Sequence, residues 1–246
     1  TAIRANEAKA FDYMPKPFDL PELMRRSSIA LERQKLAQSS NTKVNNQDVD
    51  VALVGQSPAM QILYRLIARA MNESPPVLIL GEPGTGKSLI ANSLHNLSSR
   101  AAQPLVILHP EMTDTQSEIS DAIHRAGKGT LVLDGLTDIS LNAQLRILHT
   151  LGEPSEQSAR LISIGEPKFL TNVKNGKFRG DLFFRISGLQ LTVPALRDRI
   201  EDIIILAKHF IKKASSETLF ELNSSGAEAL KMFSWPGNVR QLQNFI

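Results

Sequence analysis

Five short apolar runs recur along residues 51–246, and stretches of helical pattern separate them. Unbroken apolar runs between helices are typical of strands in a parallel sheet that is buried on both faces. The pattern predicts strands at 76–80, 104–108, 129–134, 160–164 and 189–193.

Helical periodicity marks the segments around these runs. Apolar side chains spaced by three and four residues predict one buried helix face before the first run, at Met60, Leu63, Tyr64, Ile67 and Met71. A second, helical part begins near Glu201, where EDIIILAKHF is apolar nearly all round and predicts a buried helix. Two more helices are expected, over SSGAEALKMF and from WPGNVRQL onward. The predicted fold class is α/β, with a parallel sheet followed by a small helical lid.

The first 50 residues have a different pattern. Residues 1–35 combine a helix-like start, a short strand at 11–15 and a second helix that Asp19 can cap. This set of elements is too small to bury a core of its own, so it predicts the carboxyl-terminal part of a larger α/β domain. Residues 36–50 are polar, lack periodicity and predict a linker. The expected domains are therefore 1–35, the linker 36–50, an α/β subdomain at 51–200 and a helical subdomain at 201–246.

Composition narrows the function classes. Of 246 residues, 42% are hydrophobic and 22% are charged, so the chain has enough apolar surface for a folded core. Because cysteine is absent, a disulfide scaffold and a thiolate metal site are excluded, and a reducing compartment such as the cytoplasm is expected. No apolar run approaches the roughly 20 residues that span a bilayer, so no membrane partner is expected. The net charge of only +3 indicates no basic stripe for direct DNA contact.

The strongest motif is the octapeptide GEPGTGKS, which matches G-x-x-x-x-G-K-[ST] in full. It follows the predicted strand PVLIL and opens the helical segment SLIANSLHNL, which is the context that a phosphate-binding P-loop requires. Glycines let backbone N–H groups surround phosphate oxygens, the lysine reaches the outer phosphates, and the serine hydroxyl can bind Mg²⁺. The motif predicts an ATP or ADP site at Gly81, Glu82, Pro83, Gly84, Thr85, Gly86, Lys87 and Ser88.

A second motif lies at the end of the predicted third strand. The run LVLDG places Asp134 directly after three apolar residues of the predicted strand, where P-loop proteins hold the carboxylate on the Mg²⁺ side. An Asp after a strand is by itself more often a helix cap, but the upstream P-loop favours the metal-binding interpretation. Ser88 and Asp134 are therefore the candidate Mg²⁺ ligands.

Several segments together resemble the AAA+ domain of bacterial enhancer-binding activators of the NtrC family. The first 35 residues resemble the end of a response-regulator receiver domain, through AFDYMPKPFD at 10–19. The AAA+ resemblance rests on LVGQSPAM (53–60), GEPGTGKS (81–88), GTLVLDG (129–135), GKFRGDLFFRI (176–186), VPALRDRIEDI (193–203) and WPGNVRQLQN (235–244).

The resemblance implies roles for individual residues. Arg240 corresponds to the sensor arginine that reaches the nucleotide from the lid. Arg179 and Arg185 correspond to arginine fingers that enter a neighbouring subunit's nucleotide site. Adenine would be lined by Leu53, Val54 and Gly55.

The resemblance also implies partners. In the receiver-like segment, Tyr13 corresponds to the aromatic switch and Lys16 to the lysine that contacts the phosphorylated aspartate. Family members are response regulators of sensor histidine kinases, and they form dimers that convert to rings. They bind DNA through a carboxyl-terminal domain and act on RNA polymerase, so the same partners are expected here.

The sequence departs from the family pattern at functional positions. Family members carry Glu after the strand Asp to polarise the attacking water, whereas this chain has Gly135, and Asp138 lies too far along to replace it. Glu166 stands where a sensor Asn is usual and would repel a γ-phosphate if it pointed inward. Residues 109–129 lack the GAFTGA loop that engages sigma-54 and are too few to hold it. Ser88, in place of the family's usual Glu, restores a hydroxyl ligand for Mg²⁺.

These departures favour one function and leave two others open. The favoured interpretation is an NtrC-type response regulator and transcriptional activator, with nitrogen regulation as its expected role. It binds ATP mainly as a ligand that changes conformation or oligomeric state, and it hydrolyses ATP weakly or not at all. Its expected partner is the housekeeping RNA polymerase. The alphaproteobacterial NtrC proteins that lack the loop share this pattern. The alternatives are an active AAA+ ATPase in which another residue replaces Gly135, and a nucleotide-free scaffold that only dimerises.

Overall fold

The computed structural model describes residues 53–72, 75–112, 115–151, 158–214 and 222–246. Residues 52–246 form one compact unit by their internal contacts, and the features below belong to this unit. The receiver-like segment 1–35, with its candidate switch residues Tyr13 and Lys16, and the linker 36–50 lie outside the described residues. Those expectations therefore stay predictions.

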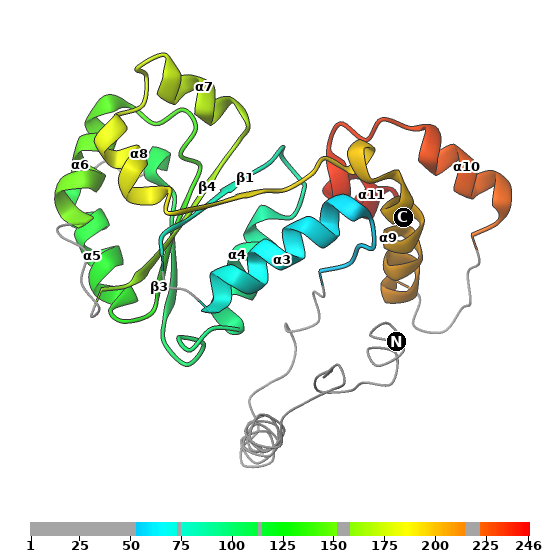
Figure 1. Cartoon of the computed structure of the whole chain (residues 1–246), viewed down its shortest axis with the longest axis horizontal. Coiled ribbons are helices and arrows are strands. Elements are labelled where there is room, and N and C mark those ends of the chain that lie inside the picture. The colour runs from blue at the N-terminus through cyan, green and yellow to red at the C-terminus, as the bar shows by residue number, and fades with distance from the viewer. Residues whose placement is uncertain (1–52, 73–74, 113–114, 152–157, 215–221) are drawn as a thin grey trace, which may run out of the picture. The chain divides into compact units, whose positions relative to one another are not determined.

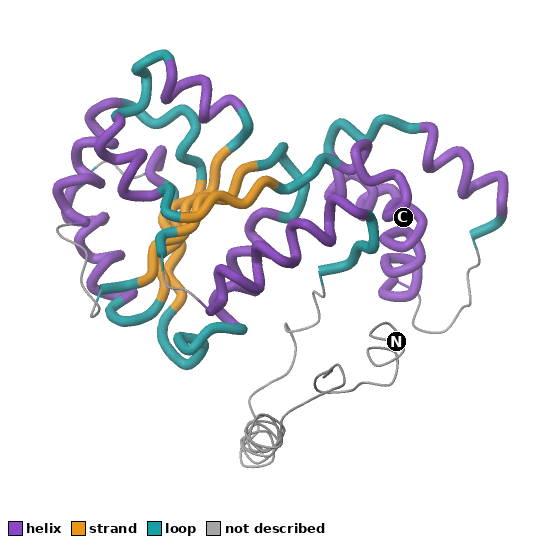
Figure 2. Tube along the Cα trace, viewed as in Figure 1, coloured by secondary structure: helices purple, strands orange, loops and turns teal. Residues whose placement is uncertain are grey.

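Five parallel strands form one sheet in the order β2-β3-β4-β1-β5 (Figure 2). The register pairs Leu80 of β1 with Gly165 of β4 and pairs Asp134 of β3 with Ile164 of β4, so these three strands end at the same edge. The five apolar runs are confirmed as strands: β1 Val77–Leu80, β2 Leu105–Leu108, β3 Thr130–Asp134, β4 Arg160–Gly165 and β5 Leu189–Thr192.

Helices cover both faces of the sheet (Figure 1). Side chains of α3 and α4 pack in one core cluster, and side chains of α5, α6, α7 and α8 pack in the cluster on the other face. A 3-10 turn, η1 Pro110–Met112, follows β2. The helices are α3 Pro58–Asn72, α4 Lys87–Asn96, α5 Gln116–Ala126, α6 Leu141–Leu151, α7 Lys168–Lys174 and α8 Gly180–Ile186.

Successive side chains of β1 point to opposite faces of the sheet and contribute to both core clusters. Val77 and Ile79 belong to the cluster under α3 and α4, whereas Leu78 and Leu80 belong to the cluster on the opposite face. Burial on both faces, as predicted, holds for β1 and β4, whose residues are all buried. It is wrong for β2, where Ile107 is 47% exposed, and for β5, where Gln190 and Thr192 are exposed, because each is an edge strand with a single neighbouring strand.

The helical lid follows β5 and has its own small core. The 3-10 turn η2 places Leu196 in this core with side chains of three helices and with the buried Trp235, which lies between α10 and α11. The lid elements are η2 Leu196–Arg199, α9 Ile200–Ala214, α10 Ser224–Met232 and α11 Asn238–Phe245. The domain limit expected at residue 200 stays a prediction.

Helix α9 corrects one expectation. Its apolar sequence predicts burial all round, but only one face is buried, at Asp202, Ile203, Leu206 and Ala207. Ile200, on the same helix, is 48% exposed. The lid is too thin to cover both sides of a helix, so α9 lies at the surface with its second apolar face partly open.

Candidate functional site

The P-loop of residues 81–88 joins β1 to α4, which begins at Lys87. Gly84 and Gly86 have φ values of +77° and +102°, a backbone conformation that glycine adopts without steric strain. The turn therefore brings the loop to the amino-terminal end of α4, where unpaired N–H groups favour an anion. The strand–loop–helix context expected from the sequence is present.

Lys87 lies folded against the loop. Its ammonium donates hydrogen bonds to the carbonyl oxygens of Gly81, at 2.7 Å, and Glu82, at 2.9 Å. Burial lowers the pKa of Lys87, while the carboxylates of Glu166 and Asp134 act in the opposite direction. The side chain is thus held inside the loop by carbonyl oxygens that a phosphate can replace as partners.

Asp134 and Ser88 meet across the site. Asp134 ends β3, and the hydroxyl of Ser88 donates to its Oδ2 at 3.5 Å. The structure therefore brings together the two oxygen groups that the sequence suggests as Mg²⁺ ligands. Within the described ranges, no group of three or more His, Asp or Glu side chains could hold a metal ion.

Glu166 follows β4, and β4 lies between the strand of the P-loop and the strand of Asp134. The backbone N–H of Gly81, the first residue of the P-loop, donates to the carbonyl of Gly165 at 3.3 Å. Glu166 is the next residue along the chain, so its backbone lies beside the P-loop. Its charge acts on the pKa of Lys87. The negative group that the sequence suggests at this position is therefore close to the site.

Gly135 and Asp138 follow β3. Gly135 has a φ of +90°, and a Cβ built there would meet nothing within 4 Å. Asp138 makes an ion pair with Lys168, at 2.6 Å between Oδ2 and Nζ. Lys168 also lies 3.9 Å from Glu166. The carboxylate of Asp138 is thus engaged by Lys168, a contact that the sequence did not indicate.

Leu53, Val54 and Gly55 form a strip between α3 and the lid. The carbonyl of Leu53 accepts from the hydroxyl of Tyr64 at 3.0 Å, and Val54 packs against the lid core. Just beyond the strip, Asp202 of α9 accepts from the backbone N–H groups of residues 56 and 57 at 2.6 and 2.9 Å. The sequence did not indicate this carboxylate, because it lies far along the chain from the segment it holds.

The lid rests directly on the P-loop. The backbone N–H of Arg240 donates to the carbonyl of Gly84 at 3.2 Å, and the charge of Arg240 lowers the pKa of Lys87. A Cβ at Gly84 would overlap the carbonyl oxygen of Gly237. The sensor arginine expected from the sequence is therefore brought to the loop.

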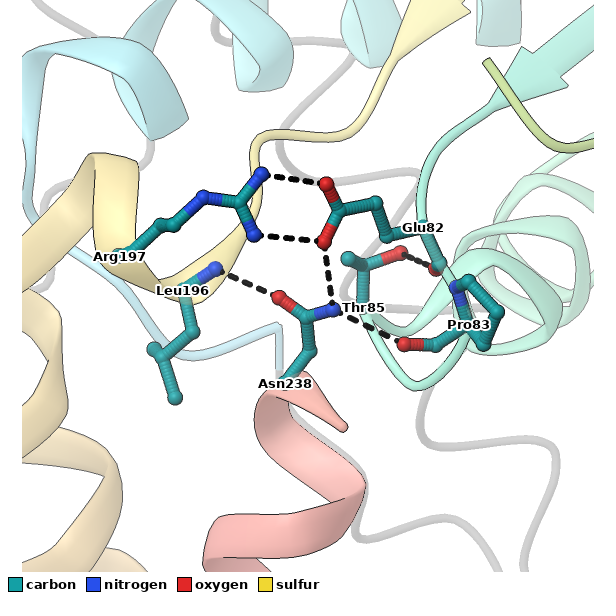
Figure 3. A network of polar contacts seen from close by, with 6 residues as sticks. All are labelled: Glu82, Pro83, Thr85, Leu196, Arg197 and Asn238. Atoms are coloured by element: carbon teal, nitrogen blue, oxygen red, sulfur yellow. Dashed lines mark hydrogen bonds and ion pairs between the residues drawn. The ribbon is translucent and has the colours of Figure 1, made fainter. Parts of the chain in front are cut away.

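A polar network joins Glu82 to two lid residues (Figure 3). The guanidinium of Arg197 forms a two-pronged ion pair with the Glu82 carboxylate, with Nη1 at 2.8 Å from Oε2. The amide of Asn238 donates to the same Oε2 at 3.2 Å. The hydrogen bonds from Arg197, and then those from Asn238, lower the pKa of Glu82 to about 2. The sequence offers one signal for this network, namely that Glu82 is an acid within a loop expected to bind an anion. Such an acid requires a partner that neutralises its charge.

Arg185 lies elsewhere, on α8, and Arg179 is the N-cap residue of that helix, which packs on the sheet face opposite to α3 and α4 (Figure 1). Arg179 forms an ion pair with Asp181, at 2.7 Å between Nη2 and Oδ2. Arg185 donates to the carbonyl of Leu151 at 3.3 Å. Among the described candidates, Asp134 and Arg240 lie at the P-loop, whereas Arg179 and Arg185 do not join them within the chain.

Two family models match the chain. A model of the Sigma-54 interaction domain matches residues 54–196, and a model of the AAA+ ATPase lid domain matches residues 197–246. The chain belongs to the Sigma-54 interaction domain family. The NtrC-family resemblance and the α/β fold with a helical lid are confirmed, whereas the receiver-like segment and the subgroup without the GAFTGA loop stay predictions.

Named relatives of this Sigma-54 interaction domain are transcription regulators. Two are called DNA-binding transcriptional regulator NtrC. The one from Azospirillum brasilense is 34% identical over 276 residues, which cover 100% of this chain and 57% of the relative. The one from a Bradyrhizobium strain is 38% identical over 274 residues, which cover 99% of this chain and 57% of the relative. NtrX from Brucella abortus, solved with ATP, is 30% identical with a TM-score of 0.69, covering 99% of this chain and 62% of that chain. The chain thus spans little more than half the length of these relatives.

The helices of this Sigma-54 interaction domain that the structure describes are short. None of them combines the length and the apolar character that crossing a bilayer requires.

Proposed function

We propose that this chain is the nucleotide-binding part of an NtrC-type transcription regulator, and that ATP acts on it mainly as a ligand that stabilises one conformation or assembly. A ligand that binds one state better than another shifts the population towards that state without being consumed. The single observation that carries the proposal is a fully formed P-loop, contacted by the lid, beside a glycine at position 135.

Nucleotide binding is supported by the geometry around the loop. Lys87 is held at the amino-terminal end of α4, and Arg240 approaches the loop from the lid. The related NtrX from Brucella abortus has been solved in complex with ATP. In this proposal the triphosphate lies on the P-loop, the strip of residues 53–55 lines the adenine, and Arg240 contacts the phosphates.

The same proposal assigns Mg²⁺ to Ser88 and Asp134. The hydroxyl of Ser88 lies within 3.5 Å of the carboxylate of Asp134, so one cation could take an oxygen ligand from each. Mg²⁺ in such a site would neutralise charge on the phosphate oxygens. Two protein ligands suit Mg²⁺, because this ion usually keeps several water molecules.

We further propose that hydrolysis is weak. Gly135 offers no side chain to polarise a water molecule, and the Asp138 carboxylate is paired with Lys168. The charge of Glu166 stands near Lys87 and opposes a γ-phosphate there. Together these features support an ATP-bound state that persists.

The partner of this state in transcription is proposed to be the housekeeping RNA polymerase. Residues 109–129 hold η1 and α5 and contain no GAFTGA motif. The alignment with the Azospirillum NtrC spans 276 positions, 30 more than the 246 residues of this chain, so that relative has residues in the aligned region that this chain lacks. These observations support membership of the alphaproteobacterial NtrC subgroup without the sigma-54 contact loop.

The remaining partners are inferred from the family. We propose a cytoplasmic regulator of nitrogen assimilation that receives phosphate from a sensor histidine kinase and binds DNA through a further domain. Self-association into dimers or rings would bring Arg179 and Arg185 to a neighbour's nucleotide. Their position on the sheet face away from α3 and α4 supports a role outside their own subunit.

A second candidate function, active ATP hydrolysis, is favoured by the position of Glu166. This carboxylate follows the strand that lies between the P-loop strand and the strand of Asp134, where a water-orienting base would be close to a γ-phosphate. If Glu166 acts in this way, Glu166→Gln abolishes turnover and leaves ATP binding intact. If it only repels phosphate, the same variant tightens ATP binding.

Isothermal titration with ATP and Mg²⁺ tests the binding proposal. We expect saturable binding, and we expect Lys87→Ala to weaken it by more than about tenfold because a charge-assisted contact to phosphate is lost. Lys174→Ala removes the same charge from an exposed position on α7 and should leave the affinity unchanged. No binding at millimolar nucleotide would favour the nucleotide-free scaffold and overturn the proposal.

A steady-state ATPase assay tests the second part. We expect turnover far below that of a family member with the intact Glu. Rapid turnover that Lys87→Ala abolishes would contradict weak hydrolysis and support the second candidate.

A further inference from the structure

Glu82 faces two ways. Its backbone carbonyl accepts from Lys87 at 2.9 Å and from the hydroxyl of Thr85 at 2.8 Å, which are residues of the phosphate loop. Its side-chain carboxylate points to the lid, where it accepts from Arg197 and Asn238 (Figure 3). One residue therefore connects the group that would contact phosphate with the helical subdomain.

Asn238 uses its whole side-chain amide at this junction. Its Oδ1 accepts from the backbone N–H of Leu196 at 2.8 Å, and its Nδ2 donates to Glu82 and, at 3.0 Å, to the carbonyl of Pro83. The side chain is fully buried, and these partners leave one orientation of the amide. Its φ of +53° is one that Asn tolerates better than most residues. Asn238 thus fixes the start of both η2 and α11 on the P-loop.

The negative charge of Glu82 opposes the binding of an anionic ligand at the P-loop unless a partner neutralises it. A carboxylate on the second residue of a phosphate loop adds a negative charge where a polyphosphate brings several more. Arg197 neutralises it with both arms of the guanidinium. The ion pair is partly exposed, with Arg197 47% exposed and Glu82 29%, and ion pairs in contact with solvent contribute little to folding. Stability of the fold is therefore a weak reason for this pair to be present.

We propose that Glu82, Arg197 and Asn238 form a lid latch that positions the P-loop for a nucleoside polyphosphate and transmits its binding to the lid. The three are positioning residues, since they act through Lys87 and the loop backbone. The latch rests on the proposed function, because it needs nucleotide to bind at the P-loop. When Lys87 leaves the carbonyl of Glu82 for a phosphate oxygen, the change reaches the lid through that one residue.

The first test is a double-mutant cycle on ATP affinity in the full chain, by titration with ATP and Mg²⁺. Arg197→Gln leaves the Glu82 carboxylate uncompensated, and we expect about tenfold weaker binding. Glu82→Gln alone should weaken binding less than Arg197→Gln does, because the unpaired charge is absent, and the double variant should return to the affinity of Glu82→Gln. Arg65→Gln, at an exposed site on α3, removes the same charge and should have no effect.

Each other outcome of the cycle is decisive. An unchanged affinity in Arg197→Gln overturns the latch. A double variant as weak as Arg197→Gln also overturns it, because Arg197 would then contact the nucleotide itself. No ATP binding by the unmodified chain overturns the proposed function as well, whereas binding without coupling overturns the latch alone.

The second test follows the lid directly through the fluorescence of Trp235. It is the one tryptophan in the sequence, and it is buried in the lid core. We expect ATP to shift denaturation of the lid to higher urea in the unmodified chain and in Arg65→Gln. In Asn238→Asp, which keeps the size of the side chain and puts a carboxylate against Glu82, saturating ATP should give no shift. A full shift in Asn238→Asp would contradict transmission through the latch. If that variant does not fold, Arg197→Lys is used for the same measurement, because lysine keeps the positive charge but lacks the two-pronged guanidinium.

Discussion

At the scale of single residues, the site depends on backbone conformations as much as on side chains. Gly135 replaces the expected catalytic acid, and its φ of +90° lies in the region that favours glycine. The sequence reveals the missing carboxylate, but it does not reveal this conformation. Restoring a glutamate therefore has two separable effects, one on chemistry and one on the backbone.

Gly135→Glu is expected to raise ATP turnover and to lower the free energy of unfolding by about 1 to 2 kcal/mol, because a side chain is strained at this φ. Gly176→Glu is the matched control, since Gly176 has a φ of +70° and equally open surroundings. Both variants should lose similar stability in thermal unfolding, and only Gly135→Glu should gain turnover. A Gly135→Glu variant with unchanged turnover would favour the active ATPase.

At the scale of elements, the sequence predicts what is local and misses what depends on neighbours. The five strands and the P-loop helix follow from patterns within a few residues, and all are confirmed. The exposed face of α9 was missed because burial depends on how much structure covers a helix. The contact of Glu82 with Arg197 was missed because 115 residues separate the partners and no periodic signal connects them.

Helix α9 offers a matched pair that tests its exposure. Ile203 is 1% exposed in the lid core and Ile200 is 48% exposed on the same helix. Ile203→Ala should lower the free energy of unfolding of the lid by about 2 to 4 kcal/mol, whereas Ile200→Ala should cost less than about 1 kcal/mol. Urea denaturation followed by Trp235 fluorescence measures both, and equal losses would mean that α9 is buried all round.

At the scale of the whole described unit, one histidine links the subdomain core to pH. His95 of α4 is 4% exposed, and its Nδ1 lies 2.9 Å from the hydroxyl of Thr130 on β3. Burial lowers the pKa of His95 below its usual value of 6.5. The unfolded chain therefore binds a proton before the folded chain does as the pH falls.

Stability should consequently be full above about pH 6.5 and decline as the pH drops below that value. The slope from one such group is at most about 1.4 kcal/mol per pH unit. His95→Gln should flatten the slope between pH 7 and 5, measured as the midpoint of thermal unfolding, and His124→Gln, at an exposed position on α5, should leave it unchanged. A slope that survives His95→Gln would assign the pH dependence to other groups.

The closeness of Gly84 to the carbonyl of Gly237 has a consequence for reading related sequences. The P-loop consensus allows any residue at this place, because phosphate itself sets no requirement there. In this chain the lid excludes every other amino acid from it. A homologue with alanine or anything larger at the equivalent place must shift either its P-loop backbone or its helical subdomain, so one letter of a sequence reports on the contact between two subdomains.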